Sequence, residues 1–344
     1  MRAIQIGVNE VVEVTFGALL NQPSISFFSG ICDEVENVKK GDLFIAANTQ
    51  DAHEAIIRGA FGVLFSGEIA MSDNEVAWIS VDDLNQALFR ILRYYLMIQN
   101  QKLFILKEEE YEILSQIAIP KKNFLIFKGK LITLIGLILK QESSYIFYFG
   151  LGFEHYSLSK EIQVINQEKI ADENLPFVVN SFSLFEIRIF YKKLDYALPL
   201  PKIFIQTLAR VLLLAEECSL GVNLENLTGV SAFKPLYLDV RGFISKPGAT
   251  NRVILSTEDN KLYEQYLAYF ALYAKWAKLT LFVPPAYNEL FSPFAEVFSY
   301  TSKEELFTLL LEKKYNFALI LGANTQIFEE RFQSNLVEKN LFDF

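Results

Sequence analysis

Short hydrophobic runs alternate along the chain with segments whose apolar residues recur every three to four positions. In the first hundred residues, apolar runs predict buried strands at 42–47, 62–66 and 76–81. Helical spacing predicts a short helix over 52–59 and a longer one after Asp82, which we expect to be its N-cap. This alternation predicts a small α/β domain over residues 1–100.

The same alternation continues through the rest of the chain. A predicted strand at 124–127 runs into Lys128-Gly129-Lys130, and an apolar helix at 131–139 follows. Later segments favour strands at 144–150, 183–190, 252–256, 279–283 and 317–321, and helices at 202–217, 258–278 and 302–314. We therefore expect an α/β protein with three domains, at 1–100, 101–242 and 243–344.

Composition and charge exclude several classes of protein. The chain has 344 residues, 51% of them hydrophobic, which is enough for sizeable cores. Its longest apolar run near the Lys-Gly-Lys turn, 131–139, is far short of the roughly 20 residues that cross a bilayer, so we expect no membrane span. A net charge of −9 without a long basic run argues against nucleic acid as a partner. Two distant cysteines and the lack of a signal-peptide pattern predict a cytoplasmic protein.

Few residues have the spacing of a catalytic or metal site. His53 and His155 are the only histidines, and no Cys/His cluster or Gly-x-Ser-x-Gly elbow is present. We therefore predict no metal ligands and no catalytic residues. The acidic run 108–110 is interpreted as a solvated helix start. The stripe Tyr263, Tyr266, Tyr269, Phe270 and Tyr273 fits one helix face, and core packing is favoured over a ligand pocket.

Three consecutive segments resemble one known family. VKKGDLFIAA (38–47), DAHEAIIRGAFGVLF (51–65) and VAWISVDDLNQALFRI (76–91) are similar, in order and spacing, to the N-terminal segments of Mur ligases. Those enzymes add amino acids or dipeptides to UDP-muramoyl peptides. Weaker matches follow at 200–227, 232–242 and 317–330, and the last points to the D-alanyl-D-alanine-adding branch. The resemblance implies a three-domain Mur ligase-like architecture, here with a shortened central domain.

The resemblance also implies an ATP site, and this sequence departs from it. The family's phosphate loop, T-G-[ST]-x-G-K-T-T, wraps phosphates with glycine N–H groups and holds magnesium with a hydroxyl. Here Lys130 can match the loop lysine, but no glycine precedes Gly129, and Leu131 stands where the hydroxyl belongs. The D-S-R segment that meets UDP falls on Glu34-Val35-Glu36. We interpret the loop as a degenerate P-loop.

Three residues remain as candidate contacts. Lys130 and Arg241 are weak remnants of cofactor binding, and His53 is a weak candidate for substrate binding. For Lys130, the interpretation as a surface lysine in a turn is favoured over contact with a phosphate. For His53, a structural or exposed position is favoured over one that faces a ligand. For Arg241, the family's junction arginine and a surface arginine are equally weighted.

Two main functions follow from these departures. The favoured one is a pseudoenzyme that needs no cofactor and binds another cell-wall synthesis protein or a small ligand, linked to peptidoglycan precursor synthesis. The alternative is a divergent ligase that uses ATP and Mg²⁺ to add an amino acid or a dipeptide of the D-alanyl-D-alanine type to a UDP-muramoyl peptide. A third possibility, a small-molecule enzyme on the same frame, has no residues to support it.

Overall fold

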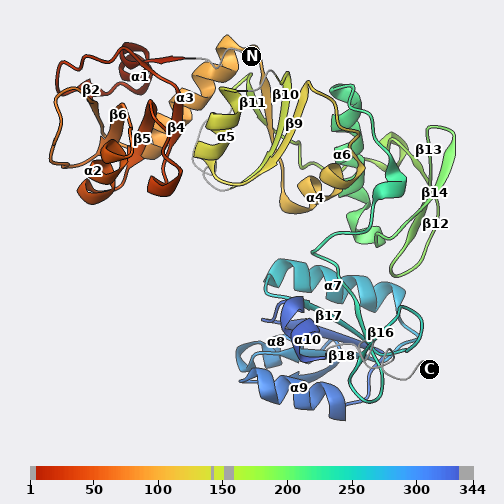
Figure 1. Cartoon of the computed structure of the whole chain (residues 1–344). Helices are drawn as coiled ribbons and strands as arrows, with labels where there is room; N and C mark the ends of the chain where they lie inside the picture. The colour runs from red at the N-terminus through yellow and green to blue at the C-terminus, as the bar shows by residue number, and fades with distance from the viewer. Residues whose placement is uncertain (1–4, 141–142, 151–158, 333–344) are drawn as a thin grey trace, which may run out of the picture. The chain divides into compact units, whose positions relative to one another are not determined.

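The computed structural model describes residues 5–140, 143–150 and 159–332, and His155 lies outside these ranges. The chain forms two compact units. The first contains Met1–Tyr111, Ala118–Glu168 and Leu214–Val222, and the second contains Glu112–Ile117, Lys169–Leu213 and Asn223–Phe344 (Figure 1). Each unit is an assembly of α-helices and β-sheets, as the sequence pattern predicts.

A five-stranded sheet forms the start of the first unit, with strand order β2-β7-β6-β5-β4. Strands β4 to β7 pair in parallel and β2 is antiparallel to β7. Their bounds are β2 (Ala18–Leu19), β4 (Gly30–Cys32), β5 (Asp42–Ala46), β6 (Gly62–Ser66) and β7 (Ala77–Val81). A separate pair, β1 (Ile6–Gly7) and β3 (Phe27–Phe28), is antiparallel.

Helices cover both faces of this sheet because alternate strand residues point to opposite sides. Leu43 and Ile45 of β5 join a cluster that includes α1 (Val8–Thr15) and α3 (Leu84–Ile98). Phe44 and Ala46 join a second cluster with Ala52 and Ala55 of α2 (Thr49–Ile57). Both faces are therefore apolar, and the strands appear in the sequence as continuous hydrophobic runs.

Two helix starts differ from the sequence-based prediction. Helix α2 begins at Thr49 rather than at 52, because the Asn48 side chain accepts a hydrogen bond from the Asp51 N–H at 2.9 Å. Helix α3 is capped by Asp83 and not by Asp82: the Asp83 carboxylate accepts from the Gln86 N–H at 3.1 Å. Either aspartate is a good cap by type, so composition alone could not choose between them.

A second, fully parallel sheet follows in the same unit, with strand order β11-β8-β10-β9. Its strands are β8 (Lys102–Ile105), β9 (Phe124–Lys128), β10 (Tyr145–Phe149) and β11 (Ile162–Val164). Helix α5 (Leu131–Ile138) leaves β9 after a short turn, as the sequence predicts. Aromatic rings stack across neighbouring strands, with Phe104 and Phe147 5.7 Å apart.

The acidic run 108–110 begins helix α4 (Glu108–Ile117), as predicted, but it is not solvated throughout. Glu110 is 1% exposed and accepts hydrogen bonds from the Lys107 N–H and the Gln167 side chain, both at 2.9 Å. Those donors compensate the cost of burying its charge. The prediction of a wholly solvated run was therefore wrong at Glu110.

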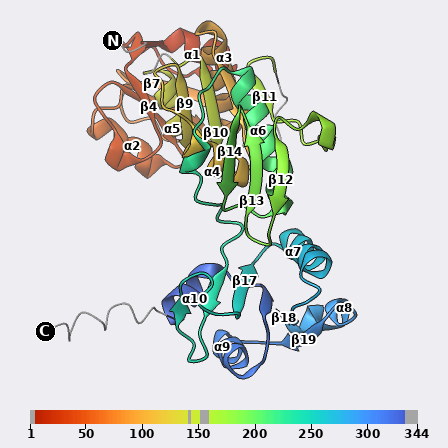
Figure 2. The same ribbon diagram turned by 90° about the vertical axis from the view of Figure 1, so that its right-hand side faces the viewer.

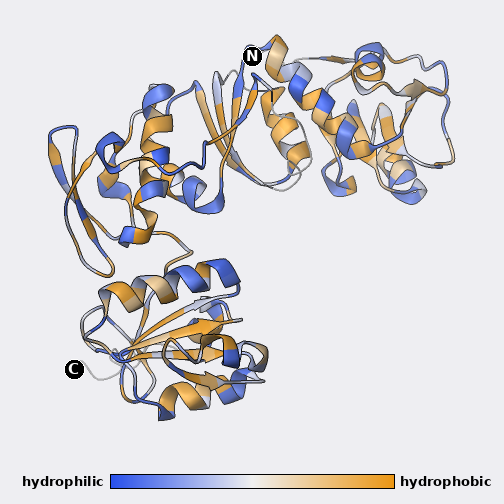
Figure 3. Ribbon diagram, turned by 180° about the vertical axis from the view of Figure 1, so that it is seen from behind, coloured by the Kyte–Doolittle hydropathy of each residue, from blue (hydrophilic) through white to orange (hydrophobic). Residues whose placement is uncertain are grey.

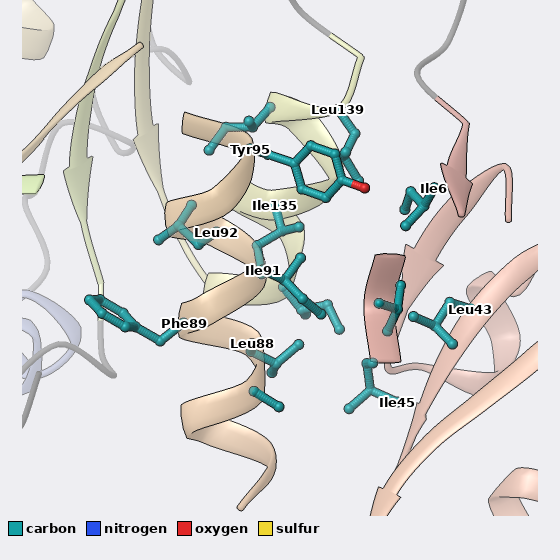
Figure 4. Packing of buried hydrophobic residues seen from close by; sticks show 14 of the residues in the cluster. Ile6, Leu43, Ile45, Leu88, Phe89, Ile91, Leu92, Tyr95, Ile135 and Leu139 are labelled. Atoms are coloured by element: carbon teal, nitrogen blue, oxygen red, sulfur yellow. The ribbon is translucent and has the colours of Figure 1, made fainter. Parts of the chain in front are cut away.

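One hydrophobic core joins the two sheets of the first unit. The cluster runs from Leu43 and Ile45 of the first sheet, through α3, to α5 and the strands of the second sheet. Figure 4 shows Leu88 and Ile91 of α3 pointing toward Leu43 and Ile45, while Ile135 of α5 lies beside Ile91. The two sheets of the first unit are thus stabilised by one shared hydrophobic core.

The second unit contains an antiparallel sheet of three strands, β12 (Val178–Phe182), β13 (Ile187–Tyr191) and β14 (Leu194–Leu198) (Figure 2). The strand predicted at 183–190 starts only at Ile187, because the Ser183 hydroxyl accepts from the Phe185 and Glu186 N–H groups and forms a turn. Helix α6 (Ile205–Glu217) follows a short 3-10 helix, Lys202–Phe204, in place of the single predicted helix from 202.

The second unit also holds a six-stranded sheet with order β16-β15-β17-β20-β18-β19. Four strands are parallel: β17 (Val253–Thr257), β18 (Leu279–Val283), β19 (Glu296–Ser299) and β20 (Phe317–Leu321). Strands β15 (Leu236–Leu238) and β16 (Ile244–Ser245) are antiparallel additions. Figure 3 shows hydrophobic residues concentrated in the strands of this sheet.

Helices of the six-stranded sheet are α7 (Asn260–Tyr273), α8 (Asn288–Phe291), α9 (Lys303–Glu312) and α10 (Thr325–Arg331). Tyr263, Tyr266, Tyr269 and Phe270 of α7 are buried, which confirms core packing for four of the five residues of the predicted stripe; the fifth, Tyr273, is half-buried. Helix α7 begins after Asp259, whose carboxylate accepts from the Lys261 and Leu262 N–H groups. In the described ranges no helix combines the length and the apolar character that a bilayer crossing requires.

Candidate ligand site

A pocket of about 710 Å³ lies in the first unit, at the carboxyl ends of β5, β9 and β10. Ligand sites in α/β proteins are commonly at this edge of a parallel sheet. The beginnings of α3 and α5 complete its wall. Its apolar lining is formed by Ile45, Leu84, Leu88, Leu131, Ile132 and Phe149, and its polar side chains are Asp33, Asn85, Lys128 and Lys130.

The turn after β9 is closed by hydrogen bonds within the protein. The Tyr148 hydroxyl donates to the Gly129 carbonyl at 2.7 Å, and the Gly129 N–H donates to the Phe149 carbonyl at 3.2 Å. Burial raises the pKa of Tyr148 to about 12, so its hydroxyl stays protonated and remains a donor at neutral pH. Gly129 has φ of 155°, and a side chain there would also meet the Phe127 ring at 2.8 Å.

Lys130 forms ion pairs with two carboxylates at the side of the pocket. Its Nζ lies 2.5 Å from Glu34 Oε1 and 3.6 Å from Asp33 Oδ2. The hydrogen bond from Lys130 lowers the pKa of Glu34, and the same bond raises the pKa of Lys130. Both groups therefore remain charged across the neutral range and hold each other in place.

Lys128 has a carboxylate partner of its own. Its Nζ lies 2.9 Å from Glu108 Oε1 and 5.0 Å from the centre of the Phe149 ring. This arrangement combines an exposed ion pair with a cation–π contact. Each lysine of the turn thus has a carboxylate within hydrogen-bond distance.

The residues of this turn differ from a phosphate loop in three respects. A phosphate loop needs several unused backbone N–H groups, a lysine that reaches the phosphates and a hydroxyl that holds magnesium. Here the Gly129 N–H is bonded to Phe149, Lys130 is paired with Glu34, and the first helical positions are Leu131 and Ile132. The α5 N-terminus has no side-chain cap, so its dipole is the main feature that still favours an anion.

Only one of the three candidate residues from the sequence lines this pocket. Lys130 does. His53 lies on α2, with its Nε2 2.8 Å from the Ala70 carbonyl oxygen, and Arg241 is exposed in a turn of the second unit. The Arg241 N–H donates to Asp239 Oδ1 at 2.8 Å. The binding roles assigned to these residues stay predictions.

Asp33 and Glu34 are the residues that sequence reasoning missed as partners of the turn. The bonded residues Lys130 and Glu34 are 96 positions apart, so local spacing could not join them. The available signal was Glu34, the first residue of the segment Glu34-Val35-Glu36 on which the family's D-S-R falls. Within the described ranges, no group of three or more His, Cys, Asp and Glu side chains has metal-site geometry.

Comparison with solved structures identifies the fold. The crystal structure of MurF from Acinetobacter baumannii matches with a TM-score of 0.59 and 12% sequence identity, covering 98% of this chain and 100% of that one. MurF ligase from Thermotoga maritima in complex with ADP matches with a TM-score of 0.54 and 12% identity, over 88% of this chain and 96% of that one. The chain has a Mur ligase fold.

The Mur ligase fold confirms the resemblance of the N-terminal segments and the expected α/β architecture. No protein-family model and no curated protein matches the sequence. The fold is therefore retained at a sequence identity where the residues of the site must be judged one by one. In the first unit, the relevant observations are the lining of the pocket and the ion pairs of Lys130.

Proposed function

We propose that the protein acts by binding a small ligand or another cell-wall synthesis protein, and not by ATP-dependent ligation. The observation that carries the proposal is the ion pair between Lys130 Nζ and Glu34 Oε1 at 2.5 Å. A phosphate would have to compete with this carboxylate for the loop lysine, which lowers what the lysine can contribute to nucleotide binding. The Mur ligase fold supports a role linked to peptidoglycan precursor synthesis.

The energetic argument concerns the phosphates of ATP. A complete loop gives them several charge-assisted hydrogen bonds, each worth roughly 1.5–3 kcal/mol. Losing two such bonds weakens binding by about 3–6 kcal/mol, or roughly 10²- to 10⁴-fold in affinity. Asp33 and Glu34 would add repulsion to this loss. We therefore expect Mg-ATP affinity no better than millimolar.

The same reasoning applies to uridine nucleotides. In the segment Glu34-Val35-Glu36, Val35 is buried and Glu36 is exposed, so the segment offers a diphosphate two acids and no cation. We expect no micromolar binding of UDP-muramoyl peptides. Titration calorimetry with these compounds measures this directly.

Calorimetry with Mg-ATP tests the central claim. The wild-type chain and Lys130→Ala are titrated side by side, and both are expected to show only millimolar or weaker binding. The matched control for loss of charge is Lys122→Ala. Lys122 is an exposed lysine that precedes β9 and does not line the pocket. Micromolar Mg-ATP binding that Lys130→Ala abolishes and Lys122→Ala retains contradicts the proposal.

A divergent ligase is the second candidate, and the likeness to MurF in complex with ADP favours it. Such an enzyme would join a carboxylate of a UDP-muramoyl peptide to the amine of an amino acid or a dipeptide of the D-alanyl-D-alanine type, with release of ADP and phosphate. ADP release that depends on both the amine and the carboxylate substrate supports this second candidate. Its absence at high enzyme concentration supports the binding function.

A further inference from the structure

A second pocket, of about 400 Å³, lies in the second unit. It is formed by the end of β12, the turn that follows it, the end of α7 and the start of β20. Its lining consists of Phe182, Ser183, Leu184, Phe185, Tyr273, Trp276 and Phe317. Five of these seven residues are aromatic and none is charged, so the pocket offers mainly ring surface to a ligand.

Trp276 is the most exposed of these aromatic residues. Its side chain is 75% exposed, although its ring lies 6.0 Å from that of Phe317 in an edge-to-face contact. Covering a large aromatic side chain removes much apolar surface from water, and a second ring can do so with favourable ring–ring geometry. The lining therefore favours a ligand that has an aromatic ring of its own.

One cation lies beside these rings. The Nζ of Lys202 is 4.1 Å from the centre of the Phe182 ring and 5.3 Å from the centre of the Tyr273 ring. Lys202 is half-buried, and within the described ranges no carboxylate forms an ion pair with it. Lys128 and Lys130 of the first unit, by contrast, each have a carboxylate partner. The charge of Lys202 is thus held at the pocket by ring faces alone.

The charge of Lys202 sets the preferred charge of a ligand. The neighbouring acid Glu186 does not line this pocket, and its Oε1 accepts a hydrogen bond from Arg188 Nε at 3.2 Å. A cationic ligand would be repelled by Lys202, whose ammonium already uses the faces of two of the rings. A carboxylate would instead compensate that ammonium.

We propose that this pocket binds a small aromatic carboxylate, with the ring against Phe185, Trp276 and Phe317 and the carboxylate at Lys202 Nζ. The inference goes beyond the proposed function, because it assigns a site in the second unit that is separate from the pocket beside Lys130. The rings give affinity for an aromatic body, and Lys202 gives the preference for a negative charge.

Three probes separate the ring from the charge. Phenylacetate has both, phenylacetamide has the same ring without the charge, and acetate has the charge without the ring. Binding is measured by calorimetry at low salt on the full chain. We expect phenylacetate to bind about tenfold more tightly than phenylacetamide, the effect of one charge-assisted hydrogen bond in a partly exposed site, and acetate to bind more weakly than phenylacetate.

Variants then locate the preference. Lys202→Met keeps an apolar stem but removes the ammonium, and it is expected to abolish the preference for phenylacetate over phenylacetamide. Lys202→Arg keeps the charge and should retain the preference. The matched control is Lys275→Met, because Lys275 is an exposed lysine next to Trp276 that does not line the pocket. Trp276→Ala should weaken both ring-bearing probes, and thermal melts establish that each variant is folded.

Four outcomes overturn the inference. They are equal or tighter binding of phenylacetamide, equal or tighter binding of acetate, no binding of phenylacetate at roughly 10 mM, and a preference for phenylacetate that survives Lys202→Met. These outcomes are independent of the test of the proposed function. Micromolar Mg-ATP binding that depends on Lys130 would contradict the proposed function and leave the Lys202 site standing. Failure of phenylacetate to bind would remove this site and leave the proposed function unchanged.

Discussion

The Tyr148 hydroxyl donates a hydrogen bond to the Gly129 carbonyl at 2.7 Å and so joins β10 to the turn that follows β9. Tyr148 is fully buried, so its hydroxyl has little access to water. The contact fixes the turn from inside the sheet. It makes the turn a structural part of the fold, independent of any bound phosphate.

Tyr148→Phe should destabilise the first unit by about 1 kcal/mol, because the Gly129 carbonyl loses a buried donor. Urea unfolding followed by tryptophan fluorescence measures this. Trp78 is buried in the first unit, whereas Trp276 in the second is 75% exposed, so the emission change mainly reports the first unit. Tyr145→Phe, on the same strand and with a half-buried ring, is the control and should change stability by less than about 0.5 kcal/mol.

Two glycine substitutions near this turn should change the stability of the protein in opposite directions. In Gly150→Ala the new Cβ would lie 2.1 Å from the Tyr148 hydroxyl and 2.3 Å from the Gly129 carbonyl oxygen, so the turn must move. We expect a loss of about 1–3 kcal/mol. In Gly136→Ala the nearest atom is 3.9 Å away, and the site is within helix α5.

Gly136→Ala should therefore raise stability by about 0.5–1 kcal/mol, because alanine loses less backbone entropy in a helix. Both variants are compared by urea unfolding under the same conditions. A destabilised Gly136→Ala, or an unaffected Gly150→Ala, would contradict the packing described for α5 and its turn.

The ion pair between Lys130 and Glu34 should depend on pH in a defined direction. The pKa of Glu34 is lowered from its usual 4.5, so the pair's contribution is fully present above that value and is lost as the pH falls through the lower folded pKa. The pKa of Lys130 is raised from 10.5, so the contribution is also lost as the pH rises through the higher folded pKa. The pair is intact between these limits.

A double-mutant cycle with Glu34→Gln and Lys130→Gln measures the coupling. We expect a favourable coupling at pH 7 that decreases below about pH 4.5, the unperturbed value for Glu34. It should also decrease in about 1 M salt, because both side chains are partly exposed. A coupling that is absent at pH 7 and low salt would mean that the two groups do not pair in solution.

The sequence predicted an element well where the hydrophobic pattern of the segment itself reflects its burial. The strands Gly62–Ser66, Leu279–Val283 and Phe317–Leu321 were predicted at their observed bounds, because strands buried on both faces are continuous apolar runs. The three-stranded sheet was hardly recognised. In β12 the apolar residues Val178 and Phe182 are exposed, so the hydrophobic pattern of this segment does not follow its burial.

The candidate site was predicted in part. The turn and Lys130 were found because a strand, a glycine and a helix are local in sequence. The partners of Lys130 come from the end of β4, and the apolar wall comes from β5 and α3. Those contacts depend on tertiary packing, which no single segment specifies.

The last prediction concerns the shared core of the first unit. Leu92 of α3 is fully buried in the cluster that connects both sheets. Leu92→Ala should destabilise the unit by about 2–5 kcal/mol, through lost burial and the cavity left behind. Met97→Ala, on the same helix but at a residue 58% exposed, should change stability by less than about 0.5 kcal/mol. Because the core is common to both sheets, hydrogen exchange in Leu92→Ala should accelerate together in β6 of the first sheet and β10 of the second. Acceleration confined to one of these strands would show that the two sheets unfold separately, in spite of the interior that they share.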